Sequence, residues 1–391
     1  MSDTHIDALL IGGGVASTAA AVELRKQGFP GSIALVTREL EPPYHRPAIT
    51  KELLGPAAEA AELLVLPREW WQDNNVELRT RSAVMSLDTG AHRAVLADKT
   101  TIHYEKALVA TGAMVRRLSL PGSALTGIHY LRAPGNAHKL RAQAAEARTA
   151  VLVGGSFIAA EVAASLTAAG VRCTMVMQER APLEIAFGTQ VADHLARSLA
   201  ERGVELICGE QVTEFTGEGA VDGVRTASGR HVPADLVVVG VGAVPDTKLA
   251  QKAGLRLGPS GGILCDSTLR TSAADHFAAG DVCEYHSEVH GRSLRVEHED
   301  HAAAQGVTAA RGILGSPEPH REVPYFWTEL GDWARLEYVG PATEWDQERV
   351  TGSFDDGDFT VWYEHRGRVV AALTCGRPGD LDRARHAIAG I

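Results

Sequence analysis

The chain has 391 residues, of which 45% are hydrophobic and 22% are charged, a composition that excludes a largely disordered protein. This length corresponds to two or three domains. Asp and Glu outnumber Lys and Arg by 49 to 38, and the net charge of −11 argues against nucleic acid as a partner. Glycine is unusually frequent, at 40 residues or about 10% against about 7% in typical proteins, whereas aromatic residues are only 5%. We therefore expect many tight turns and close backbone contacts.

The N-terminal sequence gives no sign of export. It carries no basic segment, and its apolar run Ala8–Ile11 is too short for the core of a signal peptide. No apolar run approaches the ~18–20 residues that span a membrane. The five cysteines include no CxxC pair, which argues against a disulfide scaffold, a zinc site and a redox dithiol. We therefore expect a cytoplasmic protein with no membrane contact and no metal.

Two segments, residues 8–28 and 150–170, follow the same pattern. Each has an apolar run, a glycine turn, an alanine-rich helix and a closing glycine, and a second apolar run follows, at Ser32–Thr37 and at Val171–Met177. This order of strand, turn, helix and strand is the βαβ unit of a parallel sheet. The sequence therefore predicts two Rossmann-like nucleotide-binding domains.

The remaining segments contain short apolar runs. Val76–Tyr104 alternates with turn residues and predicts antiparallel strands, and Val204–Ile207 and Val221–Val232 are similar. Runs beginning at Leu108 and Val237 end in glycine and predict buried strands. Residues 321–391 contain 10 of the 21 aromatic residues, and their alternating runs predict a small antiparallel sheet with a helix near residues 381–389. We place a domain boundary near residues 318–322.

The first glycine turn is Gly12-x-Gly14-x-x-Ser17, between a strand and a helix. Gly12 forms the tight turn, Gly14 allows close approach of a pyrophosphate, and the helix start at Val15 and Ala16 offers free N–H groups. Glu39, just after the second strand, is placed to bind a ribose hydroxyl. The alternative is a glycine turn with a purely structural role.

The second glycine turn is a degenerate copy, in which Ser156 and Ala159 stand where glycines are usual. The turn comprises Gly154, Gly155 and Ser156, and the helix opens with Phe157 and Ile158. The acidic residue expected at the end of the next strand is absent, because Met177 stands there. Glu179 could bind a 2′-hydroxyl and favour NADH, Arg180 could bind a 2′-phosphate and favour NADPH, or both could be solvated loop charges.

A third signal lies in Thr271–Val282, where a short strand at His276–Ala279 runs into Gly280 and Asp281. An aspartate at the end of a strand can accept a hydrogen bond from a polyol hydroxyl. The alternative is an ordinary aspartate turn.

In this order the motifs resemble the two-dinucleotide-binding-domain flavoprotein reductases of the glutathione-reductase type. The matching pieces are Gly12–Ser17, Ala110–Gly112, Gly154–Ala159, Gly240–Asp246 and Ala279–Asp281. The resemblance implies an α/β fold with two three-layer domains, for FAD and NAD(P), and a small C-terminal α+β domain. It implies an FAD-binding domain at residues 1–112 and 244–320, an NAD(P)-binding domain at 113–243, and a C-terminal domain at 321–391.

Two further segments narrow the resemblance. Pro43–Lys51 is similar to a segment of oxygenase-coupled ferredoxin reductases of the putidaredoxin and rhodocoxin reductase type. Arg295–Gly306 is more similar to reductases like apoptosis-inducing factor. Disulfide reductases of the superfamily carry redox cysteines in or near the early segment, whereas no cysteine precedes Cys173 here. The missing cysteines therefore argue against disulfide reduction, and the flavin is expected to be the only redox relay.

The resemblance also assigns roles to individual residues. It places Lys51 near flavin N5 with Glu161 as its partner, and it places Glu299 near the ring, where negative charge would lower the flavin potential unless the side chain turns away. His298 and His301 are three residues apart, but no clean set of further metal ligands surrounds them in the sequence, so we expect no metal site. Further expected cofactor contacts are Arg46, Val84, Ala110, Thr111, Gly112, Arg132, Gly242 and Trp327.

The expected function is that of an FAD-dependent NAD(P)H:ferredoxin oxidoreductase. It would take hydride from NADH or NADPH and pass single electrons to a ferredoxin-type iron–sulfur protein that feeds a haem or Rieske oxygenase. The protein is expected to be a monomer or homodimer. Because ferredoxins are usually acidic, docking to this acidic chain needs a local basic patch, for which the candidates are Arg46, Arg295, Arg311 and Arg321.

Two alternatives remain open. One is a reductase like apoptosis-inducing factor that uses a quinone, oxygen or a dedicated oxygenase as acceptor. The other is a redox-sensing interaction protein whose NADH-dependent dimerisation is the output.

Overall fold

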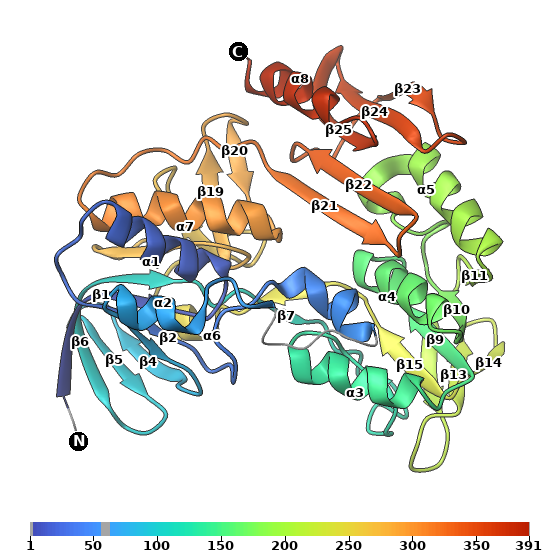
Figure 1. Ribbon diagram of the computed structural model, residues 1–391, viewed down its shortest axis with the longest axis horizontal. Coiled ribbons are helices and arrows are strands. Elements are labelled where there is room, and N and C mark those ends of the chain that lie inside the picture. Colours follow the sequence, from blue (N-terminus) through green and yellow to red (C-terminus); the bar gives the residue numbers. More distant parts are fainter. Residues whose placement is uncertain (1–2, 56–62, 391) are drawn as a thin grey trace. The chain divides into compact units, whose positions relative to one another are not determined.

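The structure, a computed structural model, describes residues 3–55 and 63–390. The chain forms two compact units (Figure 1). Unit 1 comprises the described residues of 1–45, 61–114 and 244–326, and unit 2 those of 46–60, 115–243 and 327–391. The three domain boundaries expected from the sequence stay a prediction. Within the described parts of the chain, no helix is long and apolar enough to cross a membrane.

A seven-stranded sheet forms the centre of unit 1, in the order β3-β2-β1-β6-β5-β4, with β18 paired to β6. Strands β1, β2, β3, β6 and β18 pair in parallel, whereas β4 and β5 are antiparallel. The bounds are β1 (Asp3–Ile11), β2 (Ile33–Val36), β3 (Val76–Arg79), β4 (Val84–Asp88), β5 (Arg93–Leu96), β6 (Thr101–Val109) and β18 (His276–Ala278).

Helices and a second sheet cover this centre. Ala8–Ile11 and Ile33–Val36 are buried throughout, as expected for parallel strands covered on both faces. Helices α1 and α7 lie side by side (Figure 1). The helices are α1 (Val15–Lys26), α2 (Arg68–Asp73), α6 (Lys248–Lys252) and α7 (Glu299–Ile313). A smaller sheet contains β17 (Ile263–Cys265), β19 (Cys283–Ser287) and β20 (Arg292–Leu294), and β7 (Ala113–Val115) pairs with β16 (Ala243–Pro245).

Unit 2 contains the second parallel sheet, in the order β11-β10-β9-β15-β8. Its strands are β8 (Ile128–His129), β9 (Thr149–Val153), β10 (Arg172–Val176), β11 (Glu205–Ile207) and β15 (Leu236–Val239). Its helices are α3 (Pro134–Ala144), α4 (Phe157–Ala168) and α5 (Glu184–Glu201), and the 3-10 turns Arg46–Thr50 and Glu52–Leu54 also belong here. An antiparallel sheet comprises β12 (Val212–Thr216), β13 (Gly223–Thr226) and β14 (His231–Pro233).

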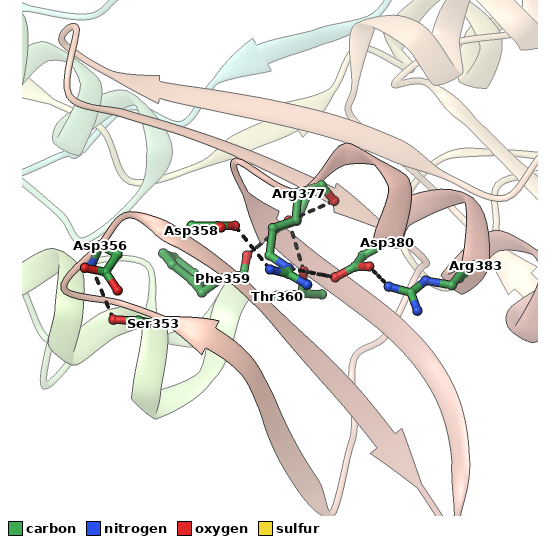
Figure 2. Close-up of polar contacts among 9 residues, drawn as sticks. Ser353, Asp356, Asp358, Phe359, Thr360, Arg377, Asp380 and Arg383 are labelled. Carbon is green, nitrogen blue, oxygen red and sulfur yellow. Dashed lines mark hydrogen bonds and ion pairs between the residues drawn. The ribbon is translucent and has the colours of Figure 1, made fainter.

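The C-terminal segment forms a five-stranded sheet in the order β21-β22-β25-β24-β23. Its elements are β21 (Tyr325–Leu330), β22 (Ala334–Val339), β23 (Gln347–Ser353), β24 (Asp358–His365), β25 (Arg368–Cys375) and helix α8 (Pro378–Ala389). Figure 2 shows the buried Asp380 in the first turn of α8, where it accepts hydrogen bonds from Thr360 Oγ1 at 2.6 Å and Arg377 Nε at 3.0 Å and pairs with Arg383. These contacts fix the helix to the sheet.

The predicted fold class is confirmed, but two strand directions differ from expectation. Val76–Arg79 pairs in parallel with β2, and Glu205–Ile207 pairs in parallel with β10. Each strand follows a helix, α2 or α5, that carries the chain back before the strand begins. The helical crossover therefore sets the strand direction, which the alternation of side chains cannot reveal.

The contact between α1 and α7 yields a stability prediction. A Cβ on Gly306 would lie 2.1 Å from the backbone oxygen of Ala16, so Gly306→Ala must push the helices apart. We expect the free energy of unfolding to fall by about 1–3 kcal/mol, as for other overpacked sites. Gly135 in α3 has no atom within 4 Å of such a Cβ, so Gly135→Ala is the matched control. Denaturant unfolding of both variants checks the difference, and equal stabilities would contradict the close approach.

Candidate functional site

The first glycine turn joins β1 to α1 in unit 1. Gly12 has φ +125°, and a Cβ there would lie 2.0 Å from the carbonyl oxygen of Ala110 at the end of β6. A Cβ on Gly14 would meet nothing within 4 Å, and no side chain caps the N–H groups of α1, which begins at Val15 and Ala16. The turn therefore leaves room at a helix N-terminus that suits a pyrophosphate.

A cavity of about 220 Å³ lies beside this turn in unit 1. Glu39 lines it, and its carboxylate accepts a hydrogen bond from Tyr44 Oη at 2.5 Å. The cations Arg38, Lys248 and Lys252 also line the cavity. Of the other residues predicted to contact a cofactor, the cavity includes Gly12, Val84 and Thr111. Its donors, acceptors and size suit the adenosine end of a dinucleotide.

The segment after β6 is fixed by its own hydrogen bonds. Thr111 Oγ1 donates to the carbonyl of Asp246 at 2.7 Å, and the carbonyl of Gly112 accepts from the Asp246 amide at 2.8 Å. Gly112 has φ +69°, which favours glycine. These contacts hold the end of β6 against the returning chain of unit 1.

Gly280 lies beside the start of α1. A Cβ on Gly280 would be 3.5 Å from the Cβ atoms of Ala16 and Ala302, and its amide donates to Gln305 Oε1 at 2.7 Å. The following carbonyl, of Asp281, accepts from Arg295 at 3.1 Å. Three sequence-predicted pieces, Gly12–Ala16, Ala110 and Gly280, are thus brought together within unit 1.

Gln305 determines which ring nitrogen of the buried His301 carries the proton. Its Oε1 accepts from Gly280, so its amide nitrogen donates to His301 Nε2 at 3.2 Å. His301 Nε2 must therefore be unprotonated. Burial lowers the pKa of His301 well below its usual range and that of His320, whose ring centre lies 4.9 Å away, to about 4. Both rings are neutral at physiological pH.

Glu299 lies in the first turn of α7 and pairs with His45. The carboxylate is 2.5 Å from His45 Nδ1, and this hydrogen bond raises the pKa of His45. Protonation of His45 would offset the negative charge that Glu299 is expected to bring to the flavin. The position of Glu299 relative to the ring stays a prediction.

The second glycine turn, in unit 2, repeats the geometry of the first. Gly154 has φ +109°, and a Cβ there would lie 2.3 Å from the carbonyl oxygen of Gly240. Ser156 Oγ donates to that same carbonyl at 2.6 Å and accepts from the Ala159 amide at 3.5 Å. Phe157 and Ile158 form the first turn of α4. The serine therefore replaces a glycine while capping the helix.

The two candidate ribose-binding residues have different surroundings. A Cβ on Gly155 would lie 3.0 Å from Glu179 Oε2, so this carboxylate is next to the turn. Arg180 instead pairs with Glu184 at 2.8 Å and with Asp193 at 2.6 Å. Gly242 has φ +91° and open space around it. The charge closest to the turn is thus the carboxylate rather than the guanidinium.

A buried carboxylate joins three segments of unit 2. Glu161, only 7% exposed on α4, accepts from Thr50 Oγ1 at 2.6 Å and from Lys51 Nζ at 2.8 Å through Oε2. Its other oxygen accepts from Thr328 Oγ1 at 2.6 Å. Lys51 Nζ also lies over the Trp327 ring, 5.2 Å from its centre. The structure therefore brings together the predicted Lys51, Glu161 and Trp327.

Arg46 and Arg132 are also adjacent in unit 2. The guanidinium of Arg46 donates to the backbone carbonyl of Arg132 at 2.7 Å. This bond ties the start of the Arg46–Thr50 turn to the segment that precedes α3.

Several residues of these sites were missed from the sequence. Thr50 and Thr328 each precede or follow a predicted residue, but nothing in the local pattern shows that their hydroxyls meet one carboxylate. Tyr44 belongs to the Pro43–Lys51 motif, which was the available signal. Gln305 lies four residues after His301 on one helix face, a spacing that predicts contact between the two side chains.

Comparison with known families gives two matches that together cover most of the chain. Residues 6–306 match the pyridine nucleotide-disulphide oxidoreductase family, and residues 325–390 match the reductase C-terminal domain.

Individual relatives match along nearly the whole length. A probable ferredoxin reductase of Castellaniella defragrans is 34% identical over 97% of this chain and 93% of its own. Rhodocoxin reductase of Rhodococcus erythropolis is 33% identical over 97% and 89%. Among solved structures, the ferredoxin reductase for the CYP199A2 system of Rhodopseudomonas palustris has a TM-score of 0.92 and 31% identity, covering 96% of this chain and 92% of that one. A covalent putidaredoxin reductase–putidaredoxin complex has a TM-score of 0.93 and 28% identity, covering 98% and 93%.

The buried histidines predict how stability depends on pH. His320 has a folded pKa of about 4 against an ordinary 6.5, so the unfolded chain binds more protons between these values. Stability should therefore fall as pH drops from 6.5 to 4, by about 1.4 kcal/mol per pH unit for each such histidine. Denaturant unfolding across this window measures the slope. His320→Asn should make it shallower while leaving the slope above pH 7 unchanged, and an unaltered slope below pH 6.5 would contradict the assignment.

Proposed function

Because the chain belongs to the pyridine nucleotide-disulphide oxidoreductase family, we propose that it is an FAD-dependent ferredoxin reductase. In this role it oxidises NAD(P)H and passes single electrons to a ferredoxin-type iron–sulfur protein that serves an oxygenase. The observation that carries the proposal is the contact of Lys51 with Trp327 and with the buried Glu161, in a chain with no cysteine before Cys173. Bound FAD would supply the hydride acceptor and the change from two-electron to one-electron transfer.

We propose that unit 1 binds FAD. The glycine turn and the free end of α1 suit its pyrophosphate, and the cavity lined by Glu39 suits its adenosine part. The amide of Gly280 is positioned by Gln305 on α7, next to the start of α1. Asp281 would then accept from the ribityl chain. A Cβ on Gly14 would meet no described atom within 4 Å, which leaves room for the pyrophosphate to approach the backbone.

Lys51 is proposed to stabilise negative charge that develops on the reduced flavin. A carboxylate at 2.8 Å pairs with the ammonium group and holds it in place. Two threonine hydroxyls restrict the carboxylate in turn, at 2.6 Å each. The lysine is only 11% exposed, so its charge is weakly screened by water and would act strongly on a flavin ring bound beside it.

We propose an iron–sulfur protein as the acceptor. The relatives include a rhodocoxin reductase, and the putidaredoxin reductase neighbour was solved in complex with putidaredoxin. Among the suggested docking arginines, Arg295, Arg311 and Arg321 each form an ion pair with a glutamate. These three guanidiniums are therefore partly neutralised, and a basic docking patch would need other cations as well.

The five cysteines are unpaired, which supports a reducing compartment such as the cytoplasm.

Removal of the lysine charge tests the proposed role of Lys51. We expect Lys51→Met to retain FAD but to slow anaerobic reduction by NADH by about tenfold or more and to lower the flavin potential, because a charge-stabilising donor is lost. Stopped-flow absorbance and redox titration give both values. Lys139→Met, on an exposed site of α3, is the matched control. An unchanged rate and potential in Lys51→Met would overturn the role.

The nucleotide preference follows from the side chains beside Gly155. Because Glu179 lies next to the turn while Arg180 is held by two carboxylates, we expect NADH to reduce the enzyme faster than NADPH. Glu179→Ala should lower the ratio of kcat/KM for NADH to kcat/KM for NADPH about tenfold, the scale of one charge-assisted hydrogen bond. Arg180→Ala should leave that ratio nearly unchanged. Faster reduction of the wild-type enzyme by NADPH would show that Arg180 binds the ribose phosphate.

A further inference from the structure

The start of α5 is attached directly to the second glycine turn. The amide of Leu183 donates to the carbonyl of Gly155 at 2.8 Å. Phe187, fully buried, packs edge-to-face on Phe157, with ring centres 5.5 Å apart. Any shift of Leu183–Phe187 would therefore reach the first residues of α4, where the nucleotide is proposed to bind.

Helix α5 is interrupted just after this contact. Gly188 has φ +75° and ψ −174°, a combination that is essentially restricted to glycine. The helix resumes at Thr189 and Gln190, so their amides lack partners from the preceding turn. Such a break persists only where neighbouring groups hold it.

A carboxylate from the C-terminal segment occupies the break. Glu348, on β23, accepts hydrogen bonds from the Thr189 amide at 3.2 Å and the Gln190 amide at 3.3 Å. Trp345 Nε1 donates to the same carboxylate at 3.0 Å and restricts its position. A Cβ on Gly188 would lie only 2.0 Å from Glu348 Oε1, so the missing side chain makes room for this contact.

A second bond from the C-terminal segment fixes the residue before the break. Tyr363 Oη, buried on β24, donates to the Phe187 carbonyl at 2.7 Å. The ring of Tyr363 packs against Trp345, with centres 4.8 Å apart, and Tyr338 packs on Phe187 at 5.9 Å. The carbonyl and the amides on the two sides of Gly188 are thus held by one sheet, whose strands lie beside α5 in Figure 1.

We propose that Glu348 and Tyr363 are positioning residues for nicotinamide nucleotide binding. They hold Phe187–Gln190, and through Phe187 and Leu183 this segment holds the Gly155–Phe157 turn in its binding conformation. The C-terminal segment would then tune the affinity for NADH without touching it. This inference rests on the proposed use of the Gly154–Ser156 turn for the nucleotide.

The test separates nucleotide binding from hydride transfer. In anaerobic stopped-flow experiments on the FAD-loaded full chain, we expect Glu348→Ala to raise the apparent Kd for NADH about fivefold to tenfold, the scale of a lost helix cap. The limiting rate of flavin reduction should stay within about twofold of the wild-type rate, since Glu348 makes no contact with Lys51. Glu348→Gln keeps one acceptor oxygen and should restore most of the affinity. Tyr363→Phe removes only the hydroxyl that holds the Phe187 carbonyl, so this single change should also raise the Kd for NADH.

The matched control is Glu364→Gln on the same sheet, whose carboxylate pairs with Arg349 at 3.0 Å. This variant should leave the Kd for NADH unchanged.

If Glu348→Ala and Tyr363→Phe lower the thermal midpoint but leave the Kd for NADH unaltered, the contact is merely structural and the inference is wrong. If Glu348→Ala does not fold, Glu348→Gln and Tyr363→Phe decide the outcome. If the wild-type flavin is not reduced by NADH at all, the proposed function fails, a result distinct from failure of this inference.

Discussion

The candidate site of unit 2 is organised around one buried carboxylate, Glu161. A buried ion is costly unless donors replace its lost water. Glu161 has three donors: Thr50 at the end of a 3-10 turn, Lys51 directly after it, and Thr328 on the distant strand β21. By binding all three, the carboxylate ties these two segments to α4. The same arrangement holds the lysine charge at one point.

The close approach of one backbone segment to another is the second constraint, and it explains much of the glycine content. At Gly12 and at Gly154 the residue after a strand passes so close to a neighbouring carbonyl that no side chain fits. At Gly188 the space is taken by the Glu348 side chain, and at Gly306 by the backbone of the neighbouring helix α1. Glycine frequency therefore reflects close packing of the chain on itself, both at the proposed nucleotide-binding turns and elsewhere.

The sequence predicted the features that are encoded locally. The two glycine turns and their flanking strands and helices could be identified because strand, turn and helix are consecutive. The directions of β3 and β11 could not, since they depend on the crossovers before them. The engagement of Arg180 by Asp193, and the capping of α5 by Glu348, join residues that no local pattern relates. Family resemblance supplied the pairing of Lys51 with Glu161, but not the two threonines that complete it.

The surroundings of Trp327 bear on the route that electrons can take. Lys51 lies over this indole at 5.2 Å, and Arg335 lies over it at 4.9 Å. Positive charge at the face of an aromatic ring stabilises its electrons, and it thereby makes the ring harder to oxidise. Oxidation of this indole to a radical is therefore disfavoured, so electron transfer from a flavin to an acceptor would not use Trp327 as a radical intermediate.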